Sequence, residues 1–160
     1  MKARNGFGRK QNNTSTLDQD DLDTLLFMIE EEKMAGDIYD ALYDQTGLNV
    51  FANIAASEDQ HMDVLLAQAE KLGLTLDAIL AAPEGEYVNP EIQAMYDDLM
   101  AQASTSTEAA LNVGVFIEET DIIDLAEASA EVEGTQLATI YDNLLAGSEN
   151  HLAAFESLLA

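Results

Sequence analysis

Two histidines, His61 and His151, lie in similar segments of the chain, and one of them follows a glutamate at a spacing that suits metal binding. Glu58 and His61 form a Glu-x-x-His pair. On a helix, residues three apart are neighbours, so both side chains would point to the same centre from adjacent turns. A carboxylate and an imidazole together suit Fe, Mn or Zn. One such pair is a weak indication by itself, because a single histidine on an apolar face is more often a core residue.

The segment around His61 recurs around His151, which indicates a duplicated helical hairpin. Setting one histidine on the other aligns VFANIAASEDQH (50–61) with IYDNLLAGSENH (140–151). The preceding stretches align more loosely, IEEEKMAGDI (29–38) with FIEETDIIDL (116–125). Two such hairpins would pack about a pseudo-twofold axis, where residues repeated on their inner faces meet.

Carboxylates interrupt the apolar rows of the helices that carry these segments. Glu32 falls in the apolar row of the first helix, and Glu58 and His61 fall in that of the second. On the third helix the apolar row favours Glu118, whereas the repeat favours Glu119, so both are candidates. An ionised carboxylate in a bundle core costs several kcal/mol unless a cation or hydrogen bonds compensate for its lost hydration.

Protein cations are scarce in the helical part of the chain. The 160 residues include 31 acidic and 6 basic ones, a formal net charge of −25, and only Lys33 and Lys71 follow the first ten residues. Carboxylates in the core are therefore either protonated, with raised pKa values, or bound to metal. Recurrence of the histidine segment and inward carboxylates on other helices favour metal.

The composition excludes several classes of protein. There is no Cys, which rules out disulfides, Cys-ligated zinc or iron–sulfur sites, and thiol catalysis. The negative charge argues against nucleic acid as a partner. An acidic surface attracts cations, and a salt-adapted host would explain such a surface equally well. No stretch approaches ~18 apolar residues, and the first 16 lack the apolar run of a signal peptide, so we expect no membrane association and a cytoplasmic location.

The periodicity is helical from Leu17 onward. Helices are predicted over about 17–46, 50–72, 91–103, 106–132 and 136–159. Thr16 and Asn49 are the expected N-caps of the first two, and a capping box at Thr105 is expected to open the helix at 106. We expect an all-α domain over 17–160, a four-helix bundle whose long crossover carries a short extra helix. A disordered basic tail is expected over residues 1–16.

In these segments the sequence resembles the ferritin-like superfamily of di-iron carboxylate four-helix bundles, and most of all the family named domain of unknown function 2202. The superfamily pattern is one Glu from each of two helices and a Glu-x-x-His from each of the other two. The matching segments are EEEKMAGDIYDAL (30–42), VFANIAASEDQHM (50–62), VGVFIEETDIIDL (113–125) and NLLAGSENHLAAF (143–155). The resemblance implies metal ligation by Glu32, Glu58, His61, Glu119 or Glu118, and His151.

One position departs from that pattern. Ser148 stands three residues before His151, where the resemblance implies a glutamate. Two divalent cations need four carboxylates for neutrality, and the implied set supplies three. We therefore expect either a fourth carboxylate from Glu118 or Asp121, or an asymmetric site in which one ion is weakly held, down to a single-metal protein.

The resemblance implies two Fe ions, with Mn or Zn as alternatives, and redox chemistry with dioxygen or peroxide. Ferroxidase, peroxidase and oxidase activities all fit. One alternative is a non-enzymatic module that stores or passes on metal ions, and another is a metal-free helical interaction domain. A homodimer is compatible with the resemblance, since related bundles often dimerise along helix faces.

Overall fold

The computed structural model describes residues 16–160, which form six helices and no strand. The helices are α1 (Gln19–Thr46), α2 (Asn49–Lys71), α3 (Asp77–Ala81), α4 (Pro90–Ala103), α5 (Thr107–Glu131) and α6 (Gln136–Leu159). The prediction of an all-α chain is confirmed over this range. The predicted disordered tail lies outside the described residues, apart from Thr16.

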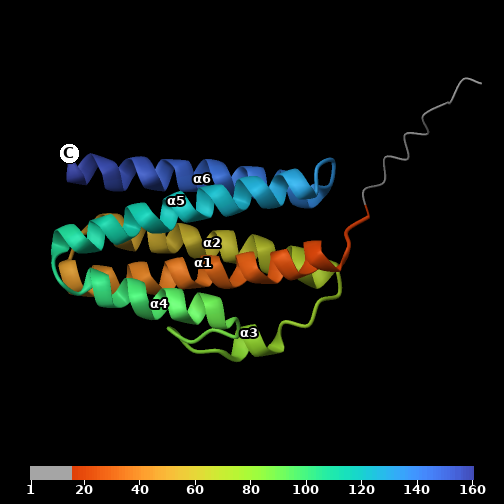
Figure 1. The fold of residues 1–160 in the computed structure, drawn as a ribbon, viewed down its shortest axis with the longest axis horizontal. Coiled ribbons are helices and arrows are strands. Elements are labelled where there is room, and N and C mark those ends of the chain that lie inside the picture. The colour runs from red at the N-terminus through yellow and green to blue at the C-terminus, as the bar shows by residue number, and fades with distance from the viewer. Residues whose placement is uncertain (1–15) are drawn as a thin grey trace, which may run out of the picture.

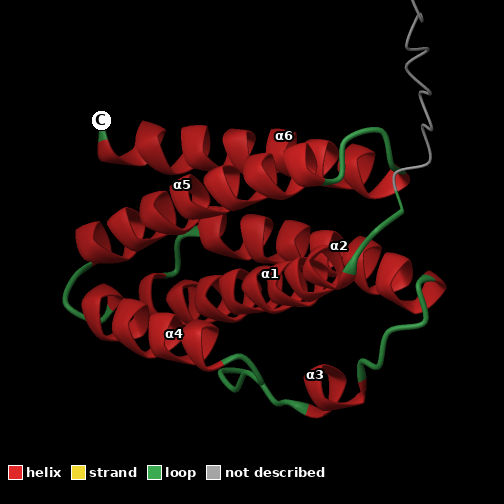
Figure 2. Cartoon of the chain, turned by 45° about the vertical axis from the view of Figure 1, so that its right-hand side comes forward, coloured by secondary structure: helices red, strands yellow, loops and turns green. Residues whose placement is uncertain are grey.

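Four long helices pack as two antiparallel hairpins, α1 with α2 and α5 with α6 (Figure 1). Helix α1 also contacts α5, and α2 contacts α6, which closes the bundle. The crossover after α2 carries α3 and α4 along the outside, and α4 packs against α1 and α5 (Figure 2). Within the described part of the chain, no helix has the length and apolar run needed to span a membrane.

The first helix begins with a different cap from the one predicted. Asp18, not Thr16, is the N-cap: its side chain accepts a hydrogen bond from the Asp21 amide, and the Asp21 side chain accepts one from the Asp18 amide. This reciprocal pair satisfies two of the helix's free amides with two carboxylates, which the positive end of the helix also favours. The helix ends as predicted before Gly47, whose φ of 70° suits glycine.

Two other predicted caps are displaced by one residue. Asn49 is the first residue of α2, and the N-cap is Leu48, which has no side-chain cap. The Leu48 amide donates instead to the Thr46 hydroxyl. Ser106, not Thr105, caps α5 by accepting from the Ala109 amide. Thr105 and Ser106 carry similar capping side chains, which explains why the sequence pattern does not separate them at α5.

The crossover contains one helix that the periodicity misses and one that it finds. The five residues of α3 are too few to show a period of 3.6. Helix α4 begins at Pro90 after Asn89, whose side chain accepts from the amides of Glu91 and Ile92. Proline at the first helical position lacks the amide that would otherwise need a partner.

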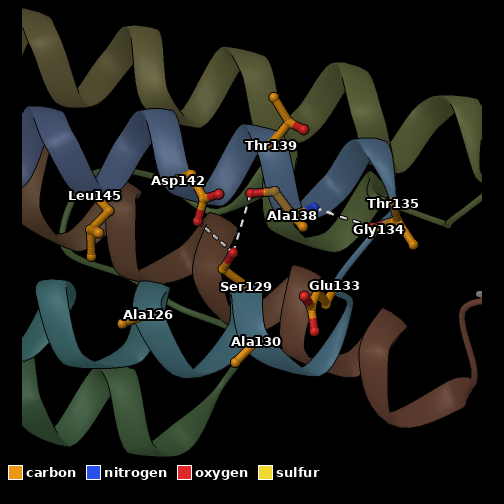
Figure 3. A pocket seen from close by; sticks show the side chains of 10 residues that line it. All are labelled: Ala126, Ser129, Ala130, Glu133, Gly134, Thr135, Ala138, Thr139, Asp142 and Leu145. Atoms are coloured by element: carbon orange, nitrogen blue, oxygen red, sulfur yellow. Dashed lines mark hydrogen bonds between the residues drawn. The ribbon is translucent and has the colours of Figure 1, made fainter.

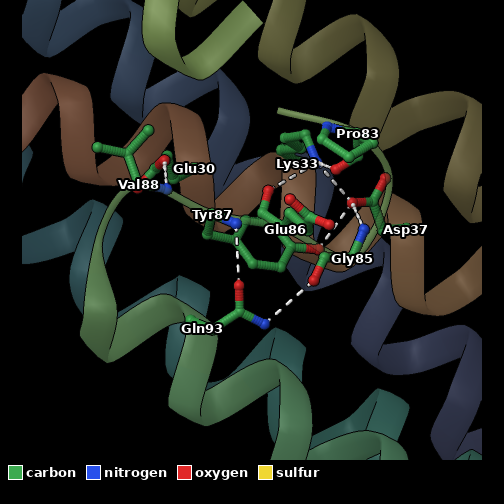
Figure 4. A network of polar contacts seen from close by, with 9 residues as sticks. All are labelled: Glu30, Lys33, Asp37, Pro83, Gly85, Glu86, Tyr87, Val88 and Gln93. Carbon is green, nitrogen blue, oxygen red and sulfur yellow. Dashed lines mark hydrogen bonds and ion pairs between the residues drawn. The ribbon is translucent and has the colours of Figure 1, made fainter. Parts of the chain in front are cut away.

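Polar contacts fasten the crossover to the outer face of α1 (Figure 4). The Lys33 ammonium pairs with Asp37 at 2.8 Å and donates to the Pro83 carbonyl at 3.0 Å. Asp37 also accepts from the Tyr87 hydroxyl at 2.7 Å. About one turn before Lys33, the Glu30 carboxylate accepts from two successive backbone amides of residues 88 and 89 at 2.6 and 2.7 Å. The cation that is nearest in sequence to Glu32 is thus engaged away from the bundle interior.

The apolar core is divided into two clusters along the bundle. The cluster near α4 is built around Tyr39, Phe51 and Phe155, whose ring centroids lie 5.3 to 6.1 Å apart. The cluster near α3 includes Leu25 and Tyr141. A level of charged and polar residues lies between them, in the middle turns of the long helices.

Two helix-interior glycines should respond oppositely to alanine. A Cβ at Gly114 would lie 2.8 Å from the buried Phe155 ring, whereas a Cβ at Gly36 would make only an ordinary contact, 3.5 Å from the Asp59 side chain. We expect Gly36→Ala to raise the free energy of unfolding by up to about 1 kcal/mol, through helix propensity. Gly114→Ala should lower it, because overpacking costs about 1 to 3 kcal/mol.

Urea unfolding of the two variants against the parent chain measures both changes. Equal stabilisation by the two alanines would contradict the close packing of Phe155 on α5.

Candidate metal centre

Five of the predicted site residues meet at the polar level between the two apolar clusters. Glu32, Glu58 and Glu118 are each about 1% exposed, and His151 is 9% exposed. The side chain of His61 is 13% exposed. They come from four different long helices, and they form two groups that share Glu58. In each group the candidate ligand atoms all lie within 4.8 Å of one another.

Glu58 lies between the two histidines. Its Oε2 atom is 2.9 Å from Nδ1 of His61, and its Oε1 atom is 2.9 Å from Nδ1 of His151. Nδ1 of His61 is 3.4 Å from Glu32, and Nδ1 of His151 is 3.5 Å from Glu118. The imidazole rings stack with centroids 5.5 Å apart. Each histidine therefore faces the shared carboxylate and one further carboxylate from its own hairpin.

Several of these atoms are buried without a hydrogen-bond partner. They are Glu32 Oε1, Glu58 Oε2, His61 Nδ1 and His151 Nδ1. The short nitrogen–oxygen contacts therefore lack hydrogen-bond geometry, although the atoms converge. Within residues 16–160, no Lys or Arg pairs with any of them. Buried carboxylate and imidazole groups that converge on a common space, with no Lys or Arg among them, are an arrangement that a metal ion could complete.

The internal repeat aligns α2 with α6 correctly, but its alignment of α1 with α5 is displaced by one residue. His61 and His151 stack as the alignment predicts. Glu118 faces the centre, whereas Glu119 is exposed. The prediction of Glu119 as an inward residue, which came from the repeat, is wrong, and the apolar row gave the better indication. One residue turns a side chain by about 100° around a helix, so a one-residue displacement moves it from the core to the surface.

Asp121 lies near the centre but belongs to neither of the two groups. It is 4% exposed, and its Oδ2 atom accepts a hydrogen bond from the hydroxyl of Ser148. Its Oδ1 atom is buried without a partner. The fully buried Ser148, three residues before His151, thus binds a carboxylate from α5.

Neighbouring residues orient the candidate ligands. The Tyr39 hydroxyl donates to Glu118 Oε1 at 2.6 Å. Nε2 of His151 lies 3.0 Å from the Ser57 hydroxyl, which leaves Nδ1 as the nitrogen that faces the carboxylates. Nε2 of His61 packs against the backbone at Gly147, where a Cβ would lie only 2.7 Å away. Tyr39 packs in the apolar cluster near α4 and also contacts the centre.

Burial controls the protonation of three of the carboxyl groups. It raises the pKa of Glu32 well above its usual value, and the charges of Asp121 and Glu58 raise it further. Burial likewise raises the pKa of Asp121, against the lowering effect of the Ser148 hydrogen bond. For Glu118, burial outweighs the contact with His151 and raises the pKa to about 7. Without a compensating cation, burial favours the protonated form of each of these groups.

Glu58 and His151 form an ion pair in the same surroundings. Burial raises the pKa of Glu58, but contacts with His151, His61 and Glu32 outweigh it and lower the pKa to about 2. Burial lowers the pKa of His151, but the carboxylates of Glu118 and Glu58 outweigh it and raise the pKa to about 10. A metal ion that binds here must displace the histidine proton.

Sequence reasoning missed two buried carboxylates beside Glu32. Glu30 is 3% exposed and caps the crossover, and Glu31 is 2% exposed and faces α5. Three consecutive residues span about 200° of a helix, so they cannot share one face. Burial of all three requires neighbours on several sides of α1, and the sequence does not reveal that α4 and its loop supply one of them.

The main surface grooves have none of the candidate metal ligands in their lining. One groove, of about 450 Å³, is at the turn between α5 and α6, where Ser129 donates to Asp142 at 2.5 Å (Figure 3). Its lining contains none of the candidate ligands. The centre itself is a packed layer inside the bundle, as expected for ligands that are nearly all buried.

Fold and site together define an all-helical bundle protein with buried glutamate and histidine groups that could hold metal. The chain belongs to the family described as "Uncharacterized protein domain (DUF2202)", which matches residues 21–159. It is 35% identical over 143 residues to "Uncharacterized protein MJ0754" of Methanocaldococcus jannaschii, which covers 89% of this chain and 77% of that protein. The crystal structure of hypothetical protein MJ0754 from Methanococcus jannaschii matches with a TM-score of 0.84 at 34% identity, over 90% of this chain and 82% of that one.

Proposed function

We propose that this protein is a ferritin-like di-metal carboxylate protein that binds two Fe(II) ions, with Mn or Zn as alternative metals, and reacts them with dioxygen or peroxide. The observation that carries the proposal is Glu58, whose two oxygens each lie 2.9 Å from Nδ1 of a different histidine. A carboxylate so placed can bridge two ions. A bundle with one long crossover between its hairpins is also the topology of ferritin-like folds.

The donor set fits such a pair of ions. His61 and Glu32 would hold one ion, His151 and Glu118 the other, and Glu58 would bridge them. Imidazole nitrogen with carboxylate oxygen suits Fe, Mn and Zn, whereas the absence of sulfur donors disfavours Cu(I). When bound, two iron ions supply two electrons to an oxidant. The chain's own residues hold the ligands in place, exclude bulk water and neutralise the ionic charge.

We infer that Asp121 supplies the fourth negative charge that balances two divalent ions. Glu32, Glu58 and Glu118 supply three negative charges, and Asp121 supplies the fourth that two divalent ions need. Its free Oδ1 atom is buried beside the centre, and its other oxygen is fixed by Ser148. The serine in the place of glutamate and the aspartate on α5 are then a compensating pair.

Asp121→Asn should weaken binding of the second ion at least tenfold, because it removes one unit of charge from a buried site. The double variant Asp121→Ser, Ser148→Glu should restore that affinity, since it returns the carboxylate from α6. Metal titration followed by calorimetry measures both changes. Two ions bound at parental affinity by Asp121→Asn would contradict the role of Asp121.

Metal analysis of protein purified without chelator tests the proposal itself. We expect about two ions per chain, and an increase in melting temperature when Fe(II) is added to the stripped protein without oxygen. Stopped-flow oxidation with dioxygen or peroxide then tests catalysis, because an enzyme must turn over more Fe(II) than it binds. Less than one ion per chain, with no thermal shift, would leave a metal-free helical interaction domain as the better interpretation.

A non-enzymatic iron-handling role is the second candidate. It is favoured by the carboxylates that surround the bundle, 31 acidic residues against two basic ones from Leu17 onward, because a surface of one sign concentrates counter-ions. Oxidation that stops after the bound iron has reacted would support this role over turnover.

A further inference from the structure

The two helices that carry the histidines make crossed contacts around them. In the internal repeat, Ser57 on α2 aligns with Gly147 on α6, and each stands four residues before the histidine of its own helix. The Ser57 hydroxyl lies 3.0 Å from Nε2 of His151, the histidine of the other helix. Gly147 lies against His61 in the same way, because a Cβ built there would be 2.7 Å from Nε2 of that ring. One small residue of each helix therefore borders the Nε2 side of the other helix's histidine.

The hydroxyl of Ser57 fixes the orientation of His151. Its oxygen can accept a hydrogen bond from the Nε2–H group of the imidazole. A histidine whose Nε2 keeps a proton in this way presents Nδ1 to a metal ion. Nδ1 of His151 is the nitrogen that faces Glu58 and Glu118. Ser57 is thus a positioning residue, which acts on the centre through the ring of His151.

The equivalent place beside His61 holds no such group. Gly147 has no side chain that could accept from Nε2, and His151 is the histidine whose Nε2 is hydrogen-bonded among residues 16–160. The side chain of His61 is 13% exposed. The ring of His61 is therefore positioned by packing and by its contacts with Glu58 and Glu32, without a hydrogen bond on its outer side.

The glycine at position 147 makes room for this ring. Glycines inside helices often allow two backbones to approach each other. Here both atoms that a Cβ would meet within 4 Å belong to the His61 imidazole, and none belongs to the α2 backbone. A larger residue at position 147 would therefore displace the ring and leave the spacing of the helices unchanged.

We propose that Ser57 and Gly147 make the two ion positions of the centre unequal. Ser57 fixes His151 as a ligand of the more firmly held ion, and Gly147 gives His61 the room to be a ligand of the more readily exchanged one. This inference rests on the proposed function and deepens it, because it assigns the weaker ion to one histidine. Partners that orient a ligating histidine change metal affinity by about 10- to 100-fold, which sets the size of the difference.

Calorimetric titration of the metal-free full-length protein with Co²⁺ tests this assignment. We expect two binding steps whose affinities differ by at least about tenfold. Ser57→Ala should weaken the tighter step by about 10- to 100-fold, and Ser57→Thr, which keeps a hydroxyl, should restore it. Rescue by threonine separates a hydrogen bond from a packing effect. Ser157→Ala, which removes an exposed hydroxyl near the end of α6, should leave both steps unchanged.

Gly147→Ala should remove the weaker step and leave the tighter one, because the added methyl group displaces the ring of His61. The ring is the free end of a side chain, and alanine favours a helix, so the metal-free variant should melt at or above the parental temperature. Gly36→Ala is the matched control. A Cβ at Gly36 would make an ordinary contact, 3.5 Å from Asp59, so this variant should bind both ions as the parent chain does.

The outcomes separate this inference from the proposed function. Two ions bound with equal affinity by the parent chain would overturn the inference and leave the di-metal proposal intact. An unchanged tighter step in Ser57→Ala, or two parental steps in Gly147→Ala, would overturn it as well. Failure of the parent chain to bind Co²⁺ would refute the proposed function and this inference together. If Gly147→Ala does not fold, the two Ser57 variants still decide the matter.

Discussion

Glu58→Ala should abolish tight binding of both metal ions at once. Each oxygen of Glu58 lies 2.9 Å from a different histidine, so one substitution removes a ligand from both halves of the centre. Loss of a residue that only orients a ligand costs about 10- to 100-fold in metal affinity. Loss of a shared ligand should therefore cost at least about 100-fold for each ion. Metal content after dialysis at micromolar protein measures the effect.

Two further variants give this experiment its controls. Glu32→Ala removes a carboxylate that faces only His61, so it should weaken one ion and spare the other. Glu119→Ala removes a carboxylate from the exposed side of α5 and should leave the binding of both ions unchanged. If Glu58→Ala unfolds, Glu58→Gln keeps the shape while removing the charge. Two tightly bound ions in the Glu58 variants would show that the metal lies elsewhere.

Metal affinity should rise steeply with pH between 6 and 8. In the metal-free protein the pKa of His151 is raised to about 10 and that of Glu118 to about 7, so both groups carry protons over much of this range. Binding must release them, and each released proton contributes tenfold per pH unit while its group remains protonated in the free protein. One proton released per ion gives about 100-fold over two pH units. Competition with a chelator of known pH dependence measures the change.

The stability of the metal-free protein, in contrast to its metal affinity, should decrease as the pH rises. The raised pKa values of Glu32, Asp121, Glu118 and His151 mean that the folded state binds more protons than the unfolded chain between about pH 5 and 8. Stability from such groups is complete at low pH and is lost as pH rises. Glu58, with its pKa lowered to about 2, acts in the opposite sense only below about pH 4.5.

The stripped protein should therefore melt at a lower temperature at pH 8 than at pH 5.5, and added Fe(II) or Mn(II) should stabilise it more at pH 8. A melting temperature that increases with pH in the metal-free protein would contradict the burial of protonated carboxyl groups in the centre.

The sequence allowed the helices to be predicted more completely than the centre. Apolar periodicity located all four long helices, and the repeat correctly predicted that His61 and His151 would meet. Both signals average over many residues, which makes them robust to local exceptions. The choice between Glu118 and Glu119 depended on one residue of register, and the repeat is weakest in that helix. The interior location of Asp121 was among the alternatives, but its bond to Ser148 depends on side-chain packing that no spacing reveals.

Caps and short elements escaped prediction for a different reason. Asp18 and Ser106 cap their helices beside equally suitable neighbours, so the decision depends on backbone geometry. Helix α3 is held by packing of Leu76 and Ile79 against the cluster near α3 more than by its own five residues. Glu31 was overlooked because its burial depends on α5, whose orientation becomes clear only when the bundle is assembled.

The polar level between the two apolar clusters also affects how the molecule fluctuates. Apolar contacts hold each half of the bundle together, whereas the polar level between them relies on ionic attraction. In the metal-free protein, amide hydrogens at the polar level should exchange with solvent sooner than those flanked by Phe51 or Leu25, even though the polar level lies far from any helix end. Metal binding would then join the two halves of the bundle into one cooperative unit.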